Sequence, residues 1–162
     1  MKTSKPKTTS FLVVLAVFVV VAGLGGGIYT FYNAKGFSYL SNQSSACNNC
    51  HVMNEVYDDW NKSSHKEVAT CSDCHLPHEL IPKWIAKAQS GIGHAYAFTF
   101  DKNLPMHFSA TKKTQEIVQE NCIRCHLPYV KNVVNPTLRP EHQDQSLKCV
   151  SCHQGVGHSR GF

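Results

Sequence analysis

The chain has 162 residues, of which 42% are hydrophobic and only 17% are charged, and its formal net charge is +5. This length allows one domain plus an anchor, and the hydrophobic content fits a chain with one membrane segment. Part of the positive charge comes from Lys2, Lys5 and Lys7 at the extreme N-terminus. The basic balance is therefore weak support for nucleic-acid binding, and we expect no nucleic-acid partner.

The N-terminal region predicts a membrane span. Residues 1–10 are polar and basic, whereas residues 11–33 are almost wholly apolar. About 20 apolar residues are enough for a helix to cross a lipid bilayer. The lysines before the span place the N-terminus in the cytoplasm, and aromatic residues at the outer end suit the membrane interface. These aromatic residues are Tyr29, Phe31 and Tyr32.

A cleaved signal peptide is the alternative for this segment. Signal peptides have a shorter apolar stretch of about 7–15 residues, followed by a small-x-small cleavage site. The outer end of the span is Tyr32-Asn33-Ala34, which lacks that pattern. We therefore predict an uncleaved signal anchor at residues 11–33, with residues 34–162 on the periplasmic side of the cytoplasmic membrane.

Eight cysteines form four copies of one motif, Cys-x-x-Cys-His, which is the attachment signature of c-type haem. In this chemistry the two thiols form thioethers to the haem vinyl groups, and the histidine is placed to reach the iron. Because no cysteine is left over, we predict four covalently bound haems. The cysteine pairs are Cys47 and Cys50, Cys71 and Cys74, Cys122 and Cys125, and Cys149 and Cys152.

Zinc ribbons and a disulfide framework are the competing interpretations of the paired cysteines. With ten histidines in the chain, chance would place one after all four pairs with a probability on the order of 10⁻⁵. Zinc has no use for a histidine at that position four times. Haem also agrees with the predicted topology, because bacteria attach it outside the cytoplasmic membrane, and its propionates offset the basic charge.

The predicted fold is mainly α-helical with much irregular structure and little or no sheet. About 128 residues follow the span, so each haem has roughly 32 residues, too few for a conventional core. We expect the porphyrins to supply most of the buried apolar surface of a compact multihaem domain. Residues 111–121 predict a helix with Ile117 and Val118 facing inward, and residues 132–145, with two prolines, predict a loop.

An amphipathic helix is predicted between residues 79 and 100, where apolar residues recur at helical spacing. Lys83 and Lys87 share another face, and His94 follows Lys87 by seven residues, or two turns. Such a helix can lie in the membrane interface, or it can pack against haem, and periodicity alone does not choose. The apolar positions are Leu80, Ile81, Trp84, Ile85, Ala88 and Ile92.

Four low-spin haems require eight axial ligands. The motif histidines offer four, and Met53 and six further histidines are available for the remainder. Composition does not choose among these candidates. The motif histidines are His51, His75, His126 and His153, and the others are His65, His78, His94, His107, His142 and His158.

The chain resembles the NapC/NirT family of membrane-anchored multihaem quinol dehydrogenases. The resemblance lies in Cys-x-x-Cys-His-x-Met at the first motif, a following Ser-Ser-His, Cys-His-Leu-Pro at the second motif, and residues 87–98 and 118–122. The short chain after the fourth motif is similar to the NrfH branch, the small quinol-oxidising subunits of cytochrome c nitrite reductase complexes. The resemblance covers the span and essentially the whole haem domain.

This resemblance implies a ligand for each haem. The first haem is bound by Met53, with His51 displaced. The second is bound by His75, and a lysine of the catalytic partner fills its other side. The ligand pairs of the third and fourth haems are His126 with His158, and His153 with His65.

The resemblance also implies a quinol site beside the first haem, formed by a lysine and an acidic residue seven positions apart. These positions are Lys87 and His94 here, so an imidazole stands where the family has a carboxylate. Imidazole can still accept a proton near neutral pH. Menaquinol would be oxidised in the outer leaflet, and its electrons would pass to a pentahaem cytochrome c nitrite reductase within a larger hetero-oligomer.

Two other functions remain open on the sequence. One is a passive tethered electron carrier that has no quinol site. The other is a quinol dehydrogenase that feeds a different periplasmic reductase. In either case we expect no reduction of nitrite on this chain itself.

Overall fold

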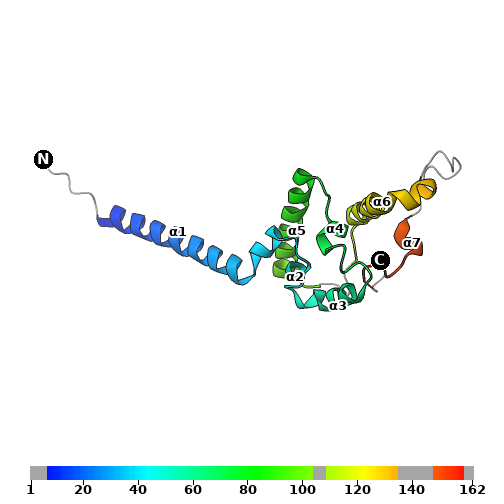
Figure 1. The fold of residues 1–162 in the computed structure, drawn as a ribbon. Coiled ribbons are helices and arrows are strands. Elements are labelled where there is room, and N and C mark those ends of the chain that lie inside the picture. The colour runs from blue at the N-terminus through cyan, green and yellow to red at the C-terminus, as the bar shows by residue number, and fades with distance from the viewer. Residues whose placement is uncertain (1–6, 104–108, 135–147, 159–162) are drawn as a thin grey trace. The chain divides into compact units, whose positions relative to one another are not determined.

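The computed structural model describes residues 7–103, 109–134 and 148–158, and every regular element within them is helical (Figure 1). The prediction of a mainly α fold with irregular connections is confirmed for this part of the chain. The chain divides into two compact units between Phe37 and Ser38, and we call the second unit the haem domain. The elements are α1 (Lys7–Asn33), η1 (Gly36–Leu40), α2 (Ser44–Cys47), η2 (His51–Met53), α3 (Asn54–Lys62), α4 (Cys71–His75), α5 (Leu80–Phe100), α6 (Lys112–Val134) and α7 (Cys149–Cys152).

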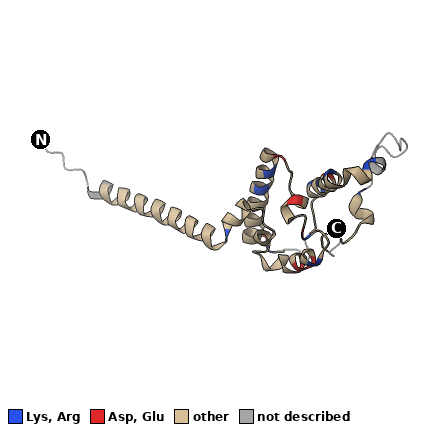
Figure 2. Ribbon diagram, viewed as in Figure 1, with Lys and Arg blue, Asp and Glu red and all other residues tan. Residues whose placement is uncertain are grey.

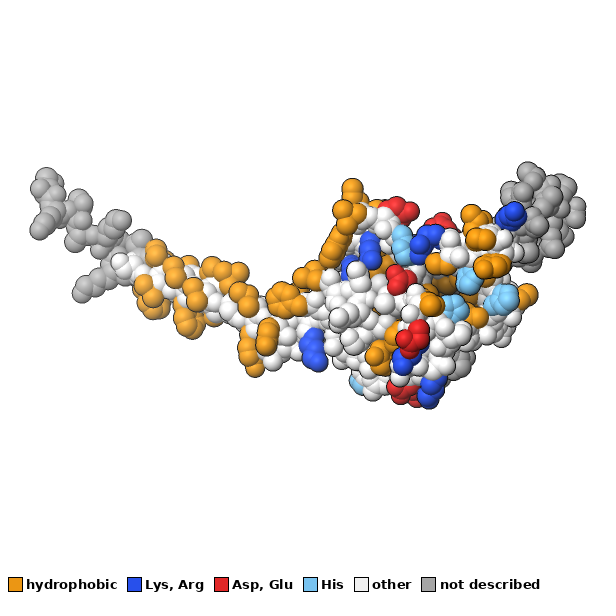
Figure 3. Space-filling view, viewed as in Figure 1, with side chains coloured by type: hydrophobic (Ala, Val, Ile, Leu, Met, Phe, Trp, Pro, Cys, Tyr) orange, Lys and Arg blue, Asp and Glu red, His pale blue; other side chains and the backbone are white. Residues whose placement is uncertain are grey.

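Helix α1 contains one candidate membrane span, Ser10–Asn33, with a mean hydropathy of 2.7. The span carries no charged residue, so its ribbon in Figure 2 has no blue or red, and Figure 3 shows apolar side chains along it. A helix that is apolar all round is suited to lipid. Its end is marked by Lys35, whose φ of 51° is the left-handed conformation common after a helix C-terminus.

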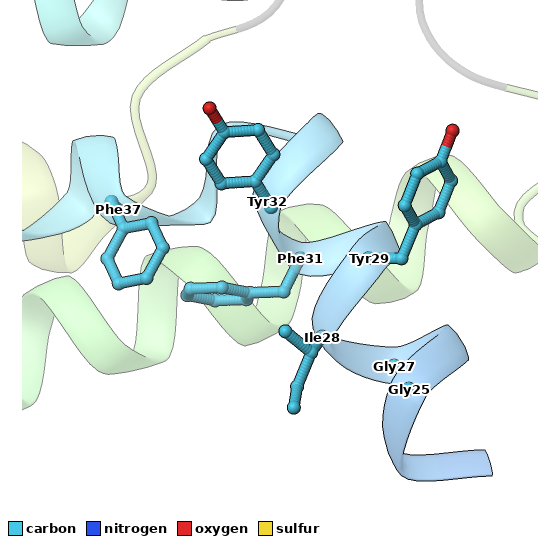
Figure 4. A pocket seen from close by; sticks show the side chains of 7 residues that line it. All are labelled: Gly25, Gly27, Ile28, Tyr29, Phe31, Tyr32 and Phe37. Atoms are coloured by element: carbon cyan, nitrogen blue, oxygen red, sulfur yellow. The ribbon is translucent and has the colours of Figure 1, made fainter. Parts of the chain in front are cut away.

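The C-terminal end of α1 carries an open apolar pocket lined by aromatic residues (Figure 4). The rings of Phe31 and Phe37 meet edge to face, with centroids 5.0 Å apart. Gly36 lies so close to the Phe31 ring that a Cβ atom there would collide with it. Tyr29 and Tyr32 are exposed, as residues of an interfacial aromatic belt should be.

Side-chain hydrogen bonds join the haem-binding motifs of the haem domain. Asn121, which precedes the third motif, is buried and donates to the carbonyl oxygens of Cys74 and Leu76, at 2.9 Å each. The backbone N–H of Cys149 donates to Gln119 Oε1 at 2.8 Å. Helix α6 therefore holds the second and fourth motifs on either side of the third.

The two predicted helices are present, with one difference in length. Helix α5 covers the predicted 79–100 segment, and in α6 Val118 is buried as expected while Lys112 and Glu116 are exposed. Helix α6 does not end near the third motif but continues to Val134. The predicted loop is therefore wrong at residues 132–134, and its remainder lies outside the described residues.

The haem domain has almost no hydrophobic core of its own. Val118 is the only apolar residue that is buried among those whose burial the structure describes, at 7% exposure. A unit of this length normally buries a continuous set of apolar side chains. The apolar surface needed to fill the interior must therefore come from another source, as predicted for haem.

Helix α4, which carries His75, begins at a charged cap. The Asp73 carboxylate accepts hydrogen bonds from the Thr70 backbone N–H at 2.8 Å and from its hydroxyl at 2.7 Å. Burial would raise the pKa of Asp73, but the hydrogen bonds from Thr70 outweigh it, so the net shift is downward. Because the folded-state pKa is depressed, the stabilisation is present at neutral pH and is lost as the pH falls through that pKa.

We expect Asp73→Asn to lower the free energy of unfolding by about 0.5–2 kcal/mol at pH 7, the usual cost of a lost cap. The difference from the unsubstituted protein should shrink as the pH is lowered into the acid range. Thermal unfolding of the haem-loaded protein, followed by circular dichroism, measures both quantities. Asp58→Asn, at an exposed position of α3, is the control. An equal loss in the two variants would contradict the assignment.

Candidate haem and quinol site

A cavity of about 390 Å³ lies in the haem domain, and segments from all four motifs form its wall. Cysteines from the first three motifs line the cavity, and His153 lines it from the fourth motif. The loop after α7 closes it with His158. Sites of several hundred Å³ lined by apolar and convergent polar groups are typical of ligand and cofactor binding. The wall includes Cys47, Met53, His65, Cys71, Cys74, His75, Cys122, His153 and His158.

Thiols of successive motifs lie close together. Cys47 and Cys71 share a hydrogen bond, which raises the pKa of Cys47 and lowers that of Cys71 to about 6. Burial raises the pKa of Cys74 to about 11, and the nearby Cys122 thiol adds to this. Burial also raises the pKa of Cys122, and the nearby Cys149 thiol adds to this. The attachment points therefore follow one another in chain order.

Two pairs of imidazole rings lie close together in the haem domain. The centroids of His75 and His158 are 6.1 Å apart with nearly parallel planes, at 12°. Those of His65 and His126 are 6.2 Å apart at 69°. Two imidazoles that each point a nitrogen at one iron would have centroids about 6 Å apart, so the separations alone would allow each pair to share a metal.

These pairs differ from those that the resemblance implies. The resemblance places His158 with His126, whereas the structure places it beside His75. It places His65 with His153, whereas the structure places His65 beside His126. His153 lies on the wall of the cavity.

Two histidines of the ring pairs have a hydrogen bond or a pKa shift that favours a neutral ring with a free nitrogen lone pair. His65 donates a hydrogen bond through Nδ1 to the Val156 carbonyl oxygen at 3.0 Å, which leaves Nε2 with its lone pair. Burial lowers the pKa of His75, and the adjacent His158 adds to this, so that the neutral ligating form is favoured. His78 differs, because Arg124 Nη2 donates to its Nε2 at 2.7 Å.

The first motif presents its methionine to the cavity. Met53 lines the wall, whereas His51 is exposed and is absent from the lining. The 3₁₀ turn η2 separates the two side chains by two positions. This placement suits the ligand role predicted for Met53. His107 and His142, considered from the sequence alone, lie outside the described residues.

Lys87 and His94 project from α5 two turns apart, and both contact the segment that leads to the first motif. Lys87 is buried, with 6% exposure, and Nζ donates to the Ser41 carbonyl oxygen at 2.7 Å and to Asn42 Oδ1 at 2.8 Å. Burial lowers the pKa of Lys87, and the charge of Lys83 adds to this. Lys87 is therefore an anchored cation rather than a solvated one.

His94 is exposed, and its Nδ1 lies 2.7 Å from the hydroxyl oxygen of Tyr39. Sequence reasoning missed Tyr39, Ser41 and Asn42 as site residues, because each lies at least 45 positions from its partner on α5. No motif or helical spacing connects residues so far apart. Helix α5 thus brings together two residues that the sequence singled out and three that it did not.

The apolar face of α5 points away from the protein. Its side chains are exposed, including Ile81 at 70% and Ile92 at 72%, and Figure 3 shows apolar atoms gathered along this helix. The usual arrangement is thereby inverted, because the lysine is buried and the apolar stripe faces outward. An exposed apolar stripe beside a functional site marks a surface that contacts another apolar phase.

The family description "NapC/NirT cytochrome c family, N-terminal region" matches residues 8–161. The chain belongs to the NapC/NirT cytochrome c family. Within it, the cytochrome c-type protein NrfH of Wolinella succinogenes is 36% identical, over 94% of this chain and 89% of that protein. A solved structure of the cytochrome c nitrite reductase NrfHA complex bound to the HQNO inhibitor is similar as well. The match has 28% identity and a TM-score of 0.56, over 83% of this chain and 86% of that chain.

The geometry of this NapC/NirT member fits covalently bound haem c. In the part of the chain that the structure describes, no three Cys, His, Asp or Glu side chains gather as a zinc ion would require. None of the eight cysteines forms a disulfide, and Cys47, Cys71, Cys74 and Cys122 line the cavity. The cofactor that this family name implies therefore has thiols available for attachment, with histidines beside them.

Proposed function

We propose that this chain is the membrane-anchored tetrahaem cytochrome of a nitrite reductase complex, and that it oxidises menaquinol and passes the electrons to the catalytic subunit. The observation that carries the proposal is the joint presence of four haem motifs and the Lys87–His94 face of α5 in a relative of NrfH. The related complex binds HQNO, an inhibitor, which supports a quinol site in this branch. The exposed apolar stripe of α5 would let that site approach the bilayer, where menaquinol dissolves.

The ligand assignment follows the observed ring pairs. Met53 would hold the first haem, His75 and His158 the second, and His126 and His65 the third. His153 lines the cavity and would hold the fourth haem. The membrane anchor is α1, with the N-terminus in the cytoplasm and the haem domain in the periplasm.

Two side chains of α5 would bind the quinol oxygens and accept a proton from them. Each menaquinol releases two protons and two electrons, and the haems, when bound, accept those electrons singly. His94 accepts a proton from a quinol hydroxyl, and Lys87 keeps one N–H for the other quinol oxygen, since two of its three are donated to Ser41 and Asn42. The thioether of Met53 is a weaker electron donor to iron than an imidazole. As a ligand it would raise the reduction potential of the first haem, which would favour electron transfer from the quinol.

Purification in mild detergent tests the proposal against its alternatives. We expect a cytochrome c nitrite reductase to copurify and menaquinol to reduce the haems of the isolated chain. Isolated protein that is reduced by dithionite but not by menaquinol would identify a passive carrier. A different reductase in the complex would show that the quinol dehydrogenase serves another respiratory pathway.

We expect the mature protein to retain the span and to carry four haems. Intact-mass measurement of the purified protein checks both, because each covalent haem adds a fixed mass and loss of the first 30-odd residues subtracts another. A mass that lacks the N-terminal segment would contradict the anchor. A mass with fewer than four haems would contradict the cofactor assignment.

A further inference from the structure

The segment before the first motif is fixed to α5 by three contacts on one face. Lys87 holds Ser41 and Asn42, as described above. One turn further along, Gly91 lies under the ring of Tyr39, whose carbon atoms are 3.6–3.7 Å from where a Cβ atom of Gly91 would be. Another turn along, the Tyr39 hydroxyl meets His94 Nδ1 at 2.7 Å. The Tyr39 ring therefore lies against α5 between the lysine and the histidine.

We propose that Tyr39 is a positioning residue for quinol oxidation, which holds His94 through Nδ1 so that Nε2 is presented to the quinol hydroxyl. This inference rests on the function proposed above, and it adds a residue that the quinol site needs once a histidine replaces the carboxylate. A carboxylate accepts a proton at either oxygen. An imidazole accepts one only at the nitrogen that lacks hydrogen. Since a tyrosine hydroxyl can donate to Nδ1 or accept from it, the proposed role requires the arrangement in which Nδ1 donates and Nε2 accepts.

The proton balance follows from this arrangement. In this arrangement neutral His94 carries its hydrogen on Nδ1 and donates it to the Tyr39 oxygen, so Nε2 has a lone pair. The quinol O–H bond would break as a new N–H bond forms at Nε2, and the electron released with that proton would be taken up by a bound haem. His94 is then a cation whose Nδ1–H still donates to Tyr39. Burial raises the pKa of Tyr39, so the residue stays a neutral phenol throughout and acts only as a hydrogen-bond partner.

Tyr39→Phe tests the proposal because it removes the hydroxyl and keeps the ring against Gly91. We expect menaquinol-dependent haem reduction to slow about 10- to 100-fold, as for loss of other groups that orient a catalytic imidazole. Affinity for HQNO and the spectrum of the dithionite-reduced haems should be unchanged. Tyr96→Phe, at an exposed tyrosine of α5, is the control and should keep the full rate. A near-normal rate in Tyr39→Phe would overturn the proposal, as would equal losses of rate and HQNO affinity.

A double-mutant cycle with His94→Ala separates positioning from general packing. If Tyr39 acts through His94, Tyr39→Phe has no further effect once the imidazole is gone, and the double variant matches His94→Ala. Additive losses would show that Tyr39 only supports the fold. A normal rate in His94→Ala would remove the quinol base itself, and hence the proposed site. A slow His94→Ala beside a normal Tyr39→Phe would remove only the inference about Tyr39.

Discussion

Replacement of His94 or Lys87 by alanine is expected to slow menaquinol oxidation about 100-fold or more while all four haems stay attached. His94→Ala removes the proton acceptor. Lys87→Ala removes a buried cation and also leaves the Ser41 carbonyl and Asn42 Oδ1 without their donor. The measurement is haem reduction by a menaquinol analogue, compared with reduction by dithionite in the same sample.

Lys112→Ala is the control for Lys87→Ala, because Lys112 is an exposed lysine of α6, whereas the hydrogen bonds of Lys87 go to Ser41 and Asn42. It should keep the rate of the unsubstituted protein. His94→Ala separates chemistry from anchoring, since it leaves both hydrogen bonds of Lys87 in place. Normal menaquinol rates in both His94→Ala and Lys87→Ala would remove the site from α5 and favour the passive carrier.

The second large effect is expected at the iron ligands. His65→Ala and His158→Ala should each convert one low-spin haem to a high-spin form, because loss of one axial imidazole leaves the iron five-coordinate or bound to water. Electron paramagnetic resonance of the purified variants measures the spin state. His78→Ala is the control, since the Nε2 of His78 is already bonded to Arg124.

The identity of the affected haem decides between the two ligand assignments. From the ring pairs, His158→Ala acts on the haem attached to Cys71 and Cys74, and His65→Ala acts on the haem attached to Cys122 and Cys125. Cryo-electron microscopy of the haem-loaded complex shows which iron each ring contacts. Density joining His158 and His126 to one iron would restore the pairing that the resemblance implies.

The cofactor and the helices were predictable because their signals are local. Cysteine spacing specifies haem attachment within five residues, and the α5 pattern repeats over a single helix. The length of α6 was not predictable, because Pro128 and the polar residues after the third motif favour an end that the helix does not have.

The partners of the predicted residues lie beyond the reach of sequence spacing. Helical spacing places Lys87 on the face opposite the apolar stripe, and only its contacts with Ser41 and Asn42 show that it is buried. The pairing of His75 with His158 joins residues 83 positions apart, and no periodicity records such a contact. Tyr39 was missed for the same reason, since its signal is a tertiary contact with His94.

The single buried apolar side chain of the described haem domain, Val118, has a consequence for biogenesis. Without bound haem the described part of the chain has little apolar surface to condense around, so we expect folding and haem attachment to proceed as one coupled process. A copy that lacks one haem keeps an apolar wall open to water, and such locally unfolded chains are the ones that proteases cleave. Proteases would thereby remove the copies in which haem attachment is incomplete. The copies that persist are those in which the path for electrons is complete.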